Sequence, residues 1–198
     1  MDIEARIREI LDAEAAAITA VPVSPAFARA VEAMQACTGR VLTTGMGKAG
    51  HVARKMAATL CSTALPSAFL HPGEALHGDL GLVSPGDLLL AYSNSGRTRE
   101  VLEVVALGRR LGLSTVIGVT SHPESGLREC CDIVLDMGPI HEPCRLGLTP
   151  TASIAVMLAI SDALALTVME RRGVTAEDFG VRHHGGYLGS KARGDLPG

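Results

Sequence analysis

Hydrophobic and polar residues alternate along this chain with two different periods. Over the first twenty residues the apolar positions lie three or four apart with Glu, Asp and Arg between them, which predicts an amphipathic opening helix. The same spacing predicts further helices over residues 27–37, 51–60, 97–111, 127–130 and 151–172. Short apolar runs bounded by turn residues predict four strands, over residues 41–44, 87–92, 115–120 and 133–136.

The order of these elements indicates an α/β fold. Strands that are apolar throughout and alternate with helices are typical of a parallel sheet whose two faces are both covered. We therefore expect a three-layer α-β-α sandwich with a mainly parallel, doubly wound sheet and extra N-terminal helices. A length of 198 residues suits one domain, which we place at residues 1–190. Residues 191–198 are polar and predict a flexible C-terminal tail.

Composition and charge narrow the class of protein. Hydrophobic residues make up 47% of the chain but aromatic residues only 3%, so the core must be built from aliphatic side chains, and disorder is excluded. Lys and Arg number 18 against 21 Asp and Glu, which gives a net charge of -3. Because nucleic acid is bound through an excess of positive charge, we expect no nucleic-acid partner.

Cysteine usage and the apolar segments indicate the compartment. The five cysteines are odd in number and lack CxxC spacing, so a reducing compartment fits better than a disulfide framework or a zinc ribbon. The charged N-terminus does not resemble a signal peptide. Residues 151–169 form the most apolar stretch, but Asp162 interrupts it, and we interpret it as a buried helix. We expect a cytoplasmic protein with no membrane partner.

A first candidate site, SNSGRT at residues 93–98, follows the second predicted strand. It offers three hydroxyls, a glycine that lets the backbone approach a ligand closely, and free N–H groups at the start of a helix. Ligands of open α/β sheets bind at this end of the strands, and a helix N-terminus favours an anion. The segment therefore predicts a phosphate cradle, with an ordinary capped turn as the alternative.

A glycine-rich turn, GMGKAG at residues 45–50, follows the first predicted strand. Its glycines match GxGxxG, but residues 65–68 contain no acidic residue to bind a ribose, so a dinucleotide site is incomplete. A P-loop is excluded because Lys48 lacks the GxxxxGK frame and a following Ser or Thr. Lys48 is therefore a candidate cation on a turn that approaches a ligand, with an exposed surface lysine as the alternative.

Two histidines and two carboxylates occur in the segment HPGEALHGDLG at residues 71–81. Imidazole and carboxylate groups are suitable zinc ligands. His71 and His77, however, lack the i, i+4 spacing of a helical zinc pair. We therefore expect no metal site in this segment.

Two more polar clusters lie in the last third of the chain. In HEPCRLGLTPT at residues 141–151, Thr149 is expected to cap the long helix with Pro150 at its first position. That interpretation leaves His141 and Glu142 unexplained at the carboxyl end of a strand. In RHHGGYLG at residues 182–189, two histidines join a glycine turn, which implies a shaped backbone.

In combination, these five segments resemble the sugar isomerase (SIS) domain family, and within it the D-arabinose 5-phosphate isomerases. The matching sequences are GMGKAGH at 45–51, FLHPGEALHGDLG at 69–81, SNSGRTRE at 93–100, CRLGLTPT at 144–151 and GVTAEDFGVRHHGGYLG at 173–189. The resemblance covers about residues 1–190. Longer members continue into a pair of CBS regulatory domains, so this sequence resembles a version with the SIS domain alone.

The resemblance implies the interconversion of D-arabinose 5-phosphate and D-ribulose 5-phosphate, a feeder step for lipopolysaccharide synthesis in Gram-negative bacteria. Such a reaction opens the sugar ring, moves a proton between C1 and C2, and passes through an enediol. A positioned base serves the proton transfer, and a cation or strong donor stabilises the enediolate. No cofactor is implied.

The resemblance also implies roles for individual residues. Glu142 is the base, Lys48 faces the developing oxyanion, His183 serves ring opening or a proton relay, and Glu100 matches a further functional position. The expected substrate-binding residues are Gly47, Ser62, Thr63, His77, Ser93, Asn94, Ser95 and Thr98. His71 matches a position where zinc binds and inhibits, which is not a cofactor site.

SIS domains commonly form tetramers, so we expect a homotetramer in which the His183 loop completes a neighbouring site, and a small sugar phosphate as the ligand. The sequence departs from arabinose 5-phosphate isomerases in having Arg97 in place of Glu, Arg145 in place of Pro, and His184 in place of Pro. These departures leave the identity of the sugar open.

Two alternatives to this function follow. A non-catalytic sugar-phosphate sensor needs the serine cradle alone, whereas the joint presence of Lys48, Glu142 and His183 favours catalysis. An isomerase of another phosphosugar, such as a hexulose phosphate, shares the cradle but lacks the His183–Gly186 motif.

Overall fold

A single parallel sheet forms the centre of the molecule. The computed structural model describes residues 1–122 and 124–195. The sheet has the order β2-β1-β3-β4-β5, and every pair of neighbouring strands is parallel. Its strands are β1 (Val41–Gly45), β2 (Ser67–Phe69), β3 (Leu88–Tyr92), β4 (Thr115–Thr120) and β5 (Ile133–Asp136).

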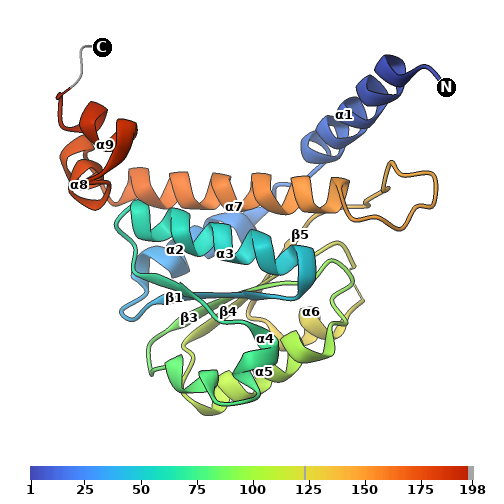
Figure 1. Ribbon diagram of the computed structural model, residues 1–198. Coiled ribbons are helices and arrows are strands. Elements are labelled where there is room, and N and C mark those ends of the chain that lie inside the picture. The colour runs from blue at the N-terminus through green and yellow to red at the C-terminus, as the bar shows by residue number, and fades with distance from the viewer. Residues whose placement is uncertain (123, 196–198) are drawn as a thin grey trace.

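Helices cover both faces of this sheet (Figure 1). One face packs against α2 (Pro25–Ala36), α3 (Gly47–Ser62) and α7 (Ala152–Arg171). The other face packs against α4 (Pro72–Ala75), α5 (Arg99–Arg110) and α6 (Gly126–Cys130), with the 3₁₀ turn η1 (Asp79–Leu82) beside them. Along β3, Leu88, Leu90 and Tyr92 point into the first layer, whereas Leu89 and Ala91 point into the second. The predicted three-layer α-β-α sandwich is confirmed.

Three more helices lie outside the sandwich. In Figure 1, α1 (Ile3–Thr19) projects from one end of α7, while α8 (Ala176–Arg182) and α9 (Gly186–Ala192) pair at the other end. No residue of α1 is buried. Among the described helices, α7 alone is long and apolar enough to cross a membrane, but it contacts α1, α2 and α3, and half of it is buried.

Most predicted elements occur within a few residues of their expected bounds. The sequence patterns missed β2, α4, α8 and α9, which are three to seven residues long and too short to show a period. The tail predicted over residues 191–198 begins inside α9, and residues 196–198 lie outside the described part of the chain.

The strand order determines where a ligand can bind. The chain leaves β1 into α3 on one face and leaves β3 into α5 on the other face, although the two strands are neighbours. Gly45 pairs with Tyr92, so both strands end at the same level. Neighbouring strands whose connections diverge in this way leave a crevice beyond their carboxyl ends.

Candidate active site

A pocket of about 290 Å³ opens at this crevice. Its walls are the loop after β1, the loop after β3 and the first turns of α7. The lining residues are Met46, Lys48, Ala49, Tyr92, Ser93, Asn94, Ser95, Thr98, Pro150, Ser153, Ile154 and Met157. The structure therefore brings Lys48 together with the four predicted cradle residues, which follow Lys48 in the sequence by 45 or more positions.

The loop after β3 has the features of an anion cradle. Gly96 adopts a φ of +62°, and a Cβ there would lie 2.1 Å from Ser125 Oγ, so this position requires glycine. Thr98 is the N-cap residue of α5, but its side chain does not cap the helix. Its hydroxyl instead lies 2.8 Å from Ser93 Oγ. Helix capping therefore does not explain the presence of Thr98. Its hydroxyl leaves the first backbone N–H groups of α5 available to a ligand.

The glycines of the loop after β1 allow α3 to pack tightly against the strand. A Cβ on Gly50 would lie 2.5 Å from the carbonyl oxygen of Gly45, and a Cβ on Gly45 would lie 2.9 Å from the carbonyl oxygen of Ala49. This contact explains two glycines of GxGxxG without a dinucleotide. Lys48 follows in the first turn of α3 with an exposed side chain, which forms no ion pair within residues 1–122 and 124–195.

Glu142 caps the start of α7. Its Oε2 accepts the backbone N–H groups of Thr151 at 2.8 Å and Ala152 at 2.9 Å, and its Oε1 accepts that of Ser153 at 3.2 Å. Partial burial raises the pKa of Glu142, but the nearby Ser153 hydroxyl and these backbone donors outweigh it and hold the pKa below its usual value. The expectation that Thr149 caps this helix with Pro150 at its first position is wrong, because the N-cap residue is Thr151 and the capping group is the Glu142 carboxylate.

Ser153 belongs to the pocket but was not predicted. It is fully buried, and its Oγ has no hydrogen-bond partner within the described residues. A serine in the first turn of an apolar helix has no sequence signal that marks it as functional. The residue lines the pocket, and its buried hydroxyl lies close enough to the Glu142 carboxylate to lower the pKa of that group.

Comparison with known proteins identifies the family. The model of the SIS domain family matches residues 34–167, which include both loops, Glu142 and Ser153. The chain belongs to the SIS domain family. The arabinose 5-phosphate isomerase KdsD of Pseudomonas aeruginosa is 48% identical over 165 residues, which are 83% of this chain and 50% of that protein. The chain thus spans about half the length of the curated relatives it matches.

Two solved structures resemble this SIS domain over nearly their whole length. A crystal structure from Bacteroides fragilis is 46% identical with a TM-score of 0.87, and the match covers 91% of this chain and 97% of that one. A protein of Escherichia coli CFT073 in complex with A5P is 38% identical, also with a TM-score of 0.87, over 92% of this chain and 97% of that chain.

Helix α1 contacts the loop that carries Glu142. Arg6 donates a hydrogen bond to the carbonyl oxygen of Pro143 and pairs with Glu9 at 2.6 Å. Arg145, one of the departures from the isomerase pattern, lies 3.5 Å from the sulfur of Met1. In this SIS domain Arg145 therefore faces α1 and does not line the pocket.

Several predicted site residues lie outside the pocket. Ser62 and Thr63 end α3, where their hydroxyls donate to carbonyl oxygens of their own helix. Because α3 has 16 residues, they lie about 24 Å from the helix start. Within one chain they cannot contribute to a phosphate held by the loop after β3.

His183 is also separated from the pocket, by the length of α7. That helix has 20 residues, or about 30 Å, and the pocket lies at its first turns whereas α8 follows its end. The His183 ring stacks on Phe179 at 3.9 Å, and its Nδ1 lies 3.2 Å from the Phe179 carbonyl oxygen. The structure of one chain therefore does not bring His183 to Lys48 or Glu142.

The other predicted residues lie near the rim or beyond it. Gly47 is exposed next to Lys48, Glu100 lies in the first turn of α5, and His77 is exposed after α4. His71 is the N-cap residue of α4, and its ring nitrogen accepts the N–H of Glu74 at 3.4 Å. In residues 1–122 and 124–195, no three His, Cys, Asp or Glu side chains are grouped to hold a metal.

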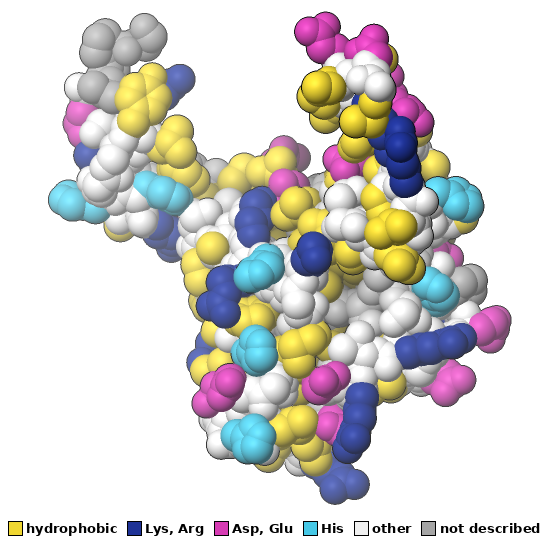
Figure 2. Space-filling view, turned by 45° about the vertical axis from the view of Figure 1, so that its right-hand side comes forward, with side chains coloured by type: hydrophobic (Ala, Val, Ile, Leu, Met, Phe, Trp, Pro, Cys, Tyr) yellow, Lys and Arg dark blue, Asp and Glu magenta, His cyan; other side chains and the backbone are white. Residues whose placement is uncertain are grey.

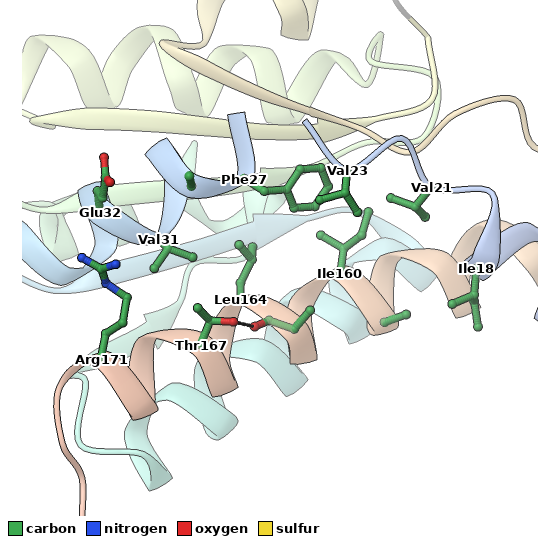
Figure 3. Close-up of a pocket in the computed structure, with 13 residues that line it drawn as sticks. Ile18, Val21, Val23, Phe27, Val31, Glu32, Ile160, Leu164, Thr167 and Arg171 are labelled. Atoms are coloured by element: carbon green, nitrogen blue, oxygen red, sulfur yellow. Dashed lines mark hydrogen bonds between the residues drawn. The ribbon is translucent and has the colours of Figure 1, made fainter. Parts of the chain in front are cut away.

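The surface has basic and apolar regions. Figure 2 shows Lys, Arg and His side chains across the face between the projecting α1 and the α8–α9 pair. A second hollow, of about 430 Å³, lies between α2 and α7 (Figure 3). Phe27, Val31, Ile160 and Leu164 line it with a mostly apolar surface, which suits packing better than catalysis.

Proposed function

We propose that this SIS domain is an aldose-ketose isomerase that interconverts D-arabinose 5-phosphate and D-ribulose 5-phosphate. The observation that carries the proposal is one pocket that combines an anion cradle, the Lys48 cation and the helix start capped by Glu142. The similarity to KdsD and to the Escherichia coli structure in complex with A5P supports the choice of substrate. Arabinose 5-phosphate formed by this interconversion would then feed lipopolysaccharide synthesis.

The phosphate binds to the loop after β3. The hydroxyls of Ser93, Ser95 and Thr98, the amide of Asn94 and the N-terminus of α5 supply donors, and the dipole of α5 favours the negative charge. Gly47 lets the neighbouring backbone approach the sugar. This anchor fixes the distance from the phosphate to the carbons that react.

Proton transfer belongs to Glu142. After ring opening, its carboxylate takes the proton from C2 of the aldose and returns it to C1 of the enediol, while the proton of the O2 hydroxyl passes to O1, which yields the ketose. Because the pKa of Glu142 lies below its usual value, the carboxylate is ionised at neutral pH but is a weak base. The reaction therefore depends on Lys48, whose ammonium stabilises the oxyanion of the enediolate. No cofactor takes part in this scheme.

The working unit is a homotetramer. The exposed apolar residues Ile3, Ile7 and Leu11 of α1 and the hollow of Figure 3 are surfaces on which further copies of this chain can pack. His183 then completes the site of a neighbouring chain and serves ring opening.

Glu100 and His77 contact the sugar, and zinc at His71 inhibits without being a cofactor. The enzyme works in the cytoplasm, without nucleic-acid or membrane partners.

A panel of pentose and hexose phosphates, assayed for interconversion and for deuterium uptake from solvent, tests the function. We expect both reactions with arabinose 5-phosphate, and neither with the Glu142→Gln variant. Reaction with a different phosphosugar would correct the substrate, for which the exposed Arg97 beside the cradle is a reason. Binding without exchange of any sugar would favour the sensor alternative.

A further inference from the structure

Three consecutive residues at the end of β4 hold the backbone of Asn94. The carbonyl oxygen of Asn94 accepts the Thr120 hydroxyl at 2.9 Å and the Ser121 backbone N–H at 3.2 Å, and His122 Nδ1 lies 2.8 Å from it. Thr120 is fully buried, and its Oγ1 accepts the backbone N–H of His122 at 3.2 Å. The group is therefore ordered by its own hydrogen bonds.

The Asn94 side chain is held from the same direction. Ser121 Oγ donates to Asn94 Oδ1 at 2.7 Å, and because a hydroxyl has one proton, this short contact defines its donor direction. The Asn94 amide nitrogen has no acceptor within the described part of the chain. A planar amide whose oxygen is fixed on one side presents its NH₂ group on the other, and Asn94 lines the pocket.

The contact also assigns the proton of His122. A carbonyl oxygen can only accept, so Nδ1 must carry the hydrogen that it donates to Asn94. An asparagine side chain can place a donor nitrogen at a similar position, whereas phenylalanine keeps the ring and loses the donor. Ser121 and His122 do not line the pocket themselves.

We propose that Ser121 and His122 are positioning residues of the anion site. They keep both oxygens of Asn94, which would repel a phosphate, on the side of β4 and leave the amide NH₂ for the ligand. The proposal rests on the proposed function, because it requires that the loop after β3 binds phosphate. Neither residue touches the substrate, and both act on the ligand only through Asn94.

Calorimetric titration of the full chain with inorganic phosphate tests the positioning without catalysis. We expect Ser121→Ala and His122→Phe to weaken phosphate binding by about three- to tenfold, because each removes one hydrogen bond that holds Asn94 in place. Ser121→Thr and His122→Asn keep the donors and should bind within about twofold of the wild type. With arabinose 5-phosphate, the loss should appear in KM rather than in kcat.

Ser114→Ala is the matched control. Its hydroxyl donates to the carbonyl oxygen of Asp87 at 2.9 Å at the opposite end of β4, so its removal should leave phosphate binding unchanged. Equal phosphate binding by wild type, Ser121→Ala and His122→Phe would overturn the positioning role alone. Absence of phosphate binding in the wild type would overturn the cradle, and with it both proposals.

Discussion

The Glu142 carboxylate accepts the backbone N–H of Ala152 at 2.9 Å, so the proposed base is also the cap of the longest helix. The two roles require the same ionised group. A carboxylate at a helix N-terminus is stabilised by the donors and by the helix dipole. Glu142 is thereby fixed beside Ser153, which lines the pocket, and its charge is linked to the stability of α7.

The Glu142→Gln variant should therefore lose both turnover and stability. We expect turnover to fall by at least about a hundredfold, because the amide cannot take a proton. Stability at pH 7 should fall by about 1 kcal/mol, since the amide accepts fewer of the three N–H bonds. Near-full activity of the variant would remove Glu142 as the base.

The stability difference between wild type and Glu142→Gln should decrease as the pH falls. The folded pKa of Glu142 lies below its usual 4.5, so the charge stabilises the folded state above about 4.5 and stops doing so as the pH falls through the folded pKa. The difference in Tm between wild type and Glu142→Gln should be about 3 °C at pH 7 and should close on acidification. A difference that persists well below pH 4.5 would contradict the capping role of the charge.

Ser153→Ala should separate stability from activity. The Ser153 hydroxyl is buried without a hydrogen bond of ordinary geometry in the described residues, although it lies close enough to Glu142 to lower the pKa of that carboxyl, so a methyl group in its place should change Tm little. We expect kcat/KM to fall by about tenfold if the hydroxyl donates to the bound sugar, since one hydrogen bond is worth roughly 1 kcal/mol or more. Unchanged kinetics would limit Ser153 to the wall of the pocket.

Ser161→Ala is the comparison within the same helix. Ser161 is equally buried, but its hydroxyl lies 2.7 Å from Tyr92 Oη and donates to the Met157 carbonyl oxygen. Its removal leaves a buried tyrosine hydroxyl without its partner and should cost about 1–2 kcal/mol. Tm should therefore fall clearly for Ser161→Ala and change little for Ser153→Ala.

Local sequence patterns were sufficient to predict the layers and both pocket loops. An apolar strand followed by a glycine or serine turn and a helix is readable from adjacent residues, as at Gly45–Gly50 and Ser93–Thr98. The parallel sheet then brings the ends of β1 and β3 together. The parts of the pocket that are formed by residues adjacent in the sequence could thus be predicted.

The remaining parts depend on distances that no local pattern contains. Glu142 caps a helix that begins ten residues later in the sequence. The local pattern instead predicted a cap at Thr149. Ser62 and Thr63 resemble ligand-binding residues by motif, but the length of α3 carries them away from the cradle. The placing of Ser153 follows from the rotation of α7, which its apolar sequence does not define.

Gly50→Ala should destabilise the fold rather than a nucleotide site. Its Cβ would lie 2.5 Å from the carbonyl oxygen of Gly45, which is backbone and cannot rotate away. We expect a loss of about 2 kcal/mol in urea unfolding, as in other overpacked interiors. Gly81→Ala is the control, because a Cβ there meets nothing within 4 Å. Equal stability of the two variants would show that the contact between β1 and α3 yields easily.

Mixed tetramers test whether His183 acts on a neighbouring chain. Lys48 and the cradle line one pocket, while His183 lies at the other end of α7, so in the proposed tetramer a single chain would contribute to two different sites. Lys48→Ala and His183→Ala should each lose at least about a hundredfold in turnover, because each removes a group to which the proposal assigns a contact with the reacting sugar.

When these two inactive variants are unfolded together and refolded as mixed assemblies, some sites receive Lys48 from one chain and an intact His183 from the other. Activity should then recover to a fraction set by the number of such sites, whereas each variant refolded alone should stay inactive. The doubly substituted Lys48→Ala, His183→Ala chain refolded with either single variant is the control and should stay inactive. Lack of recovery in tetramers that affinity capture of one tagged variant shows to contain both chains would contradict the role of His183 in a neighbouring site, and full activity of His183→Ala alone would place His183 outside the active site.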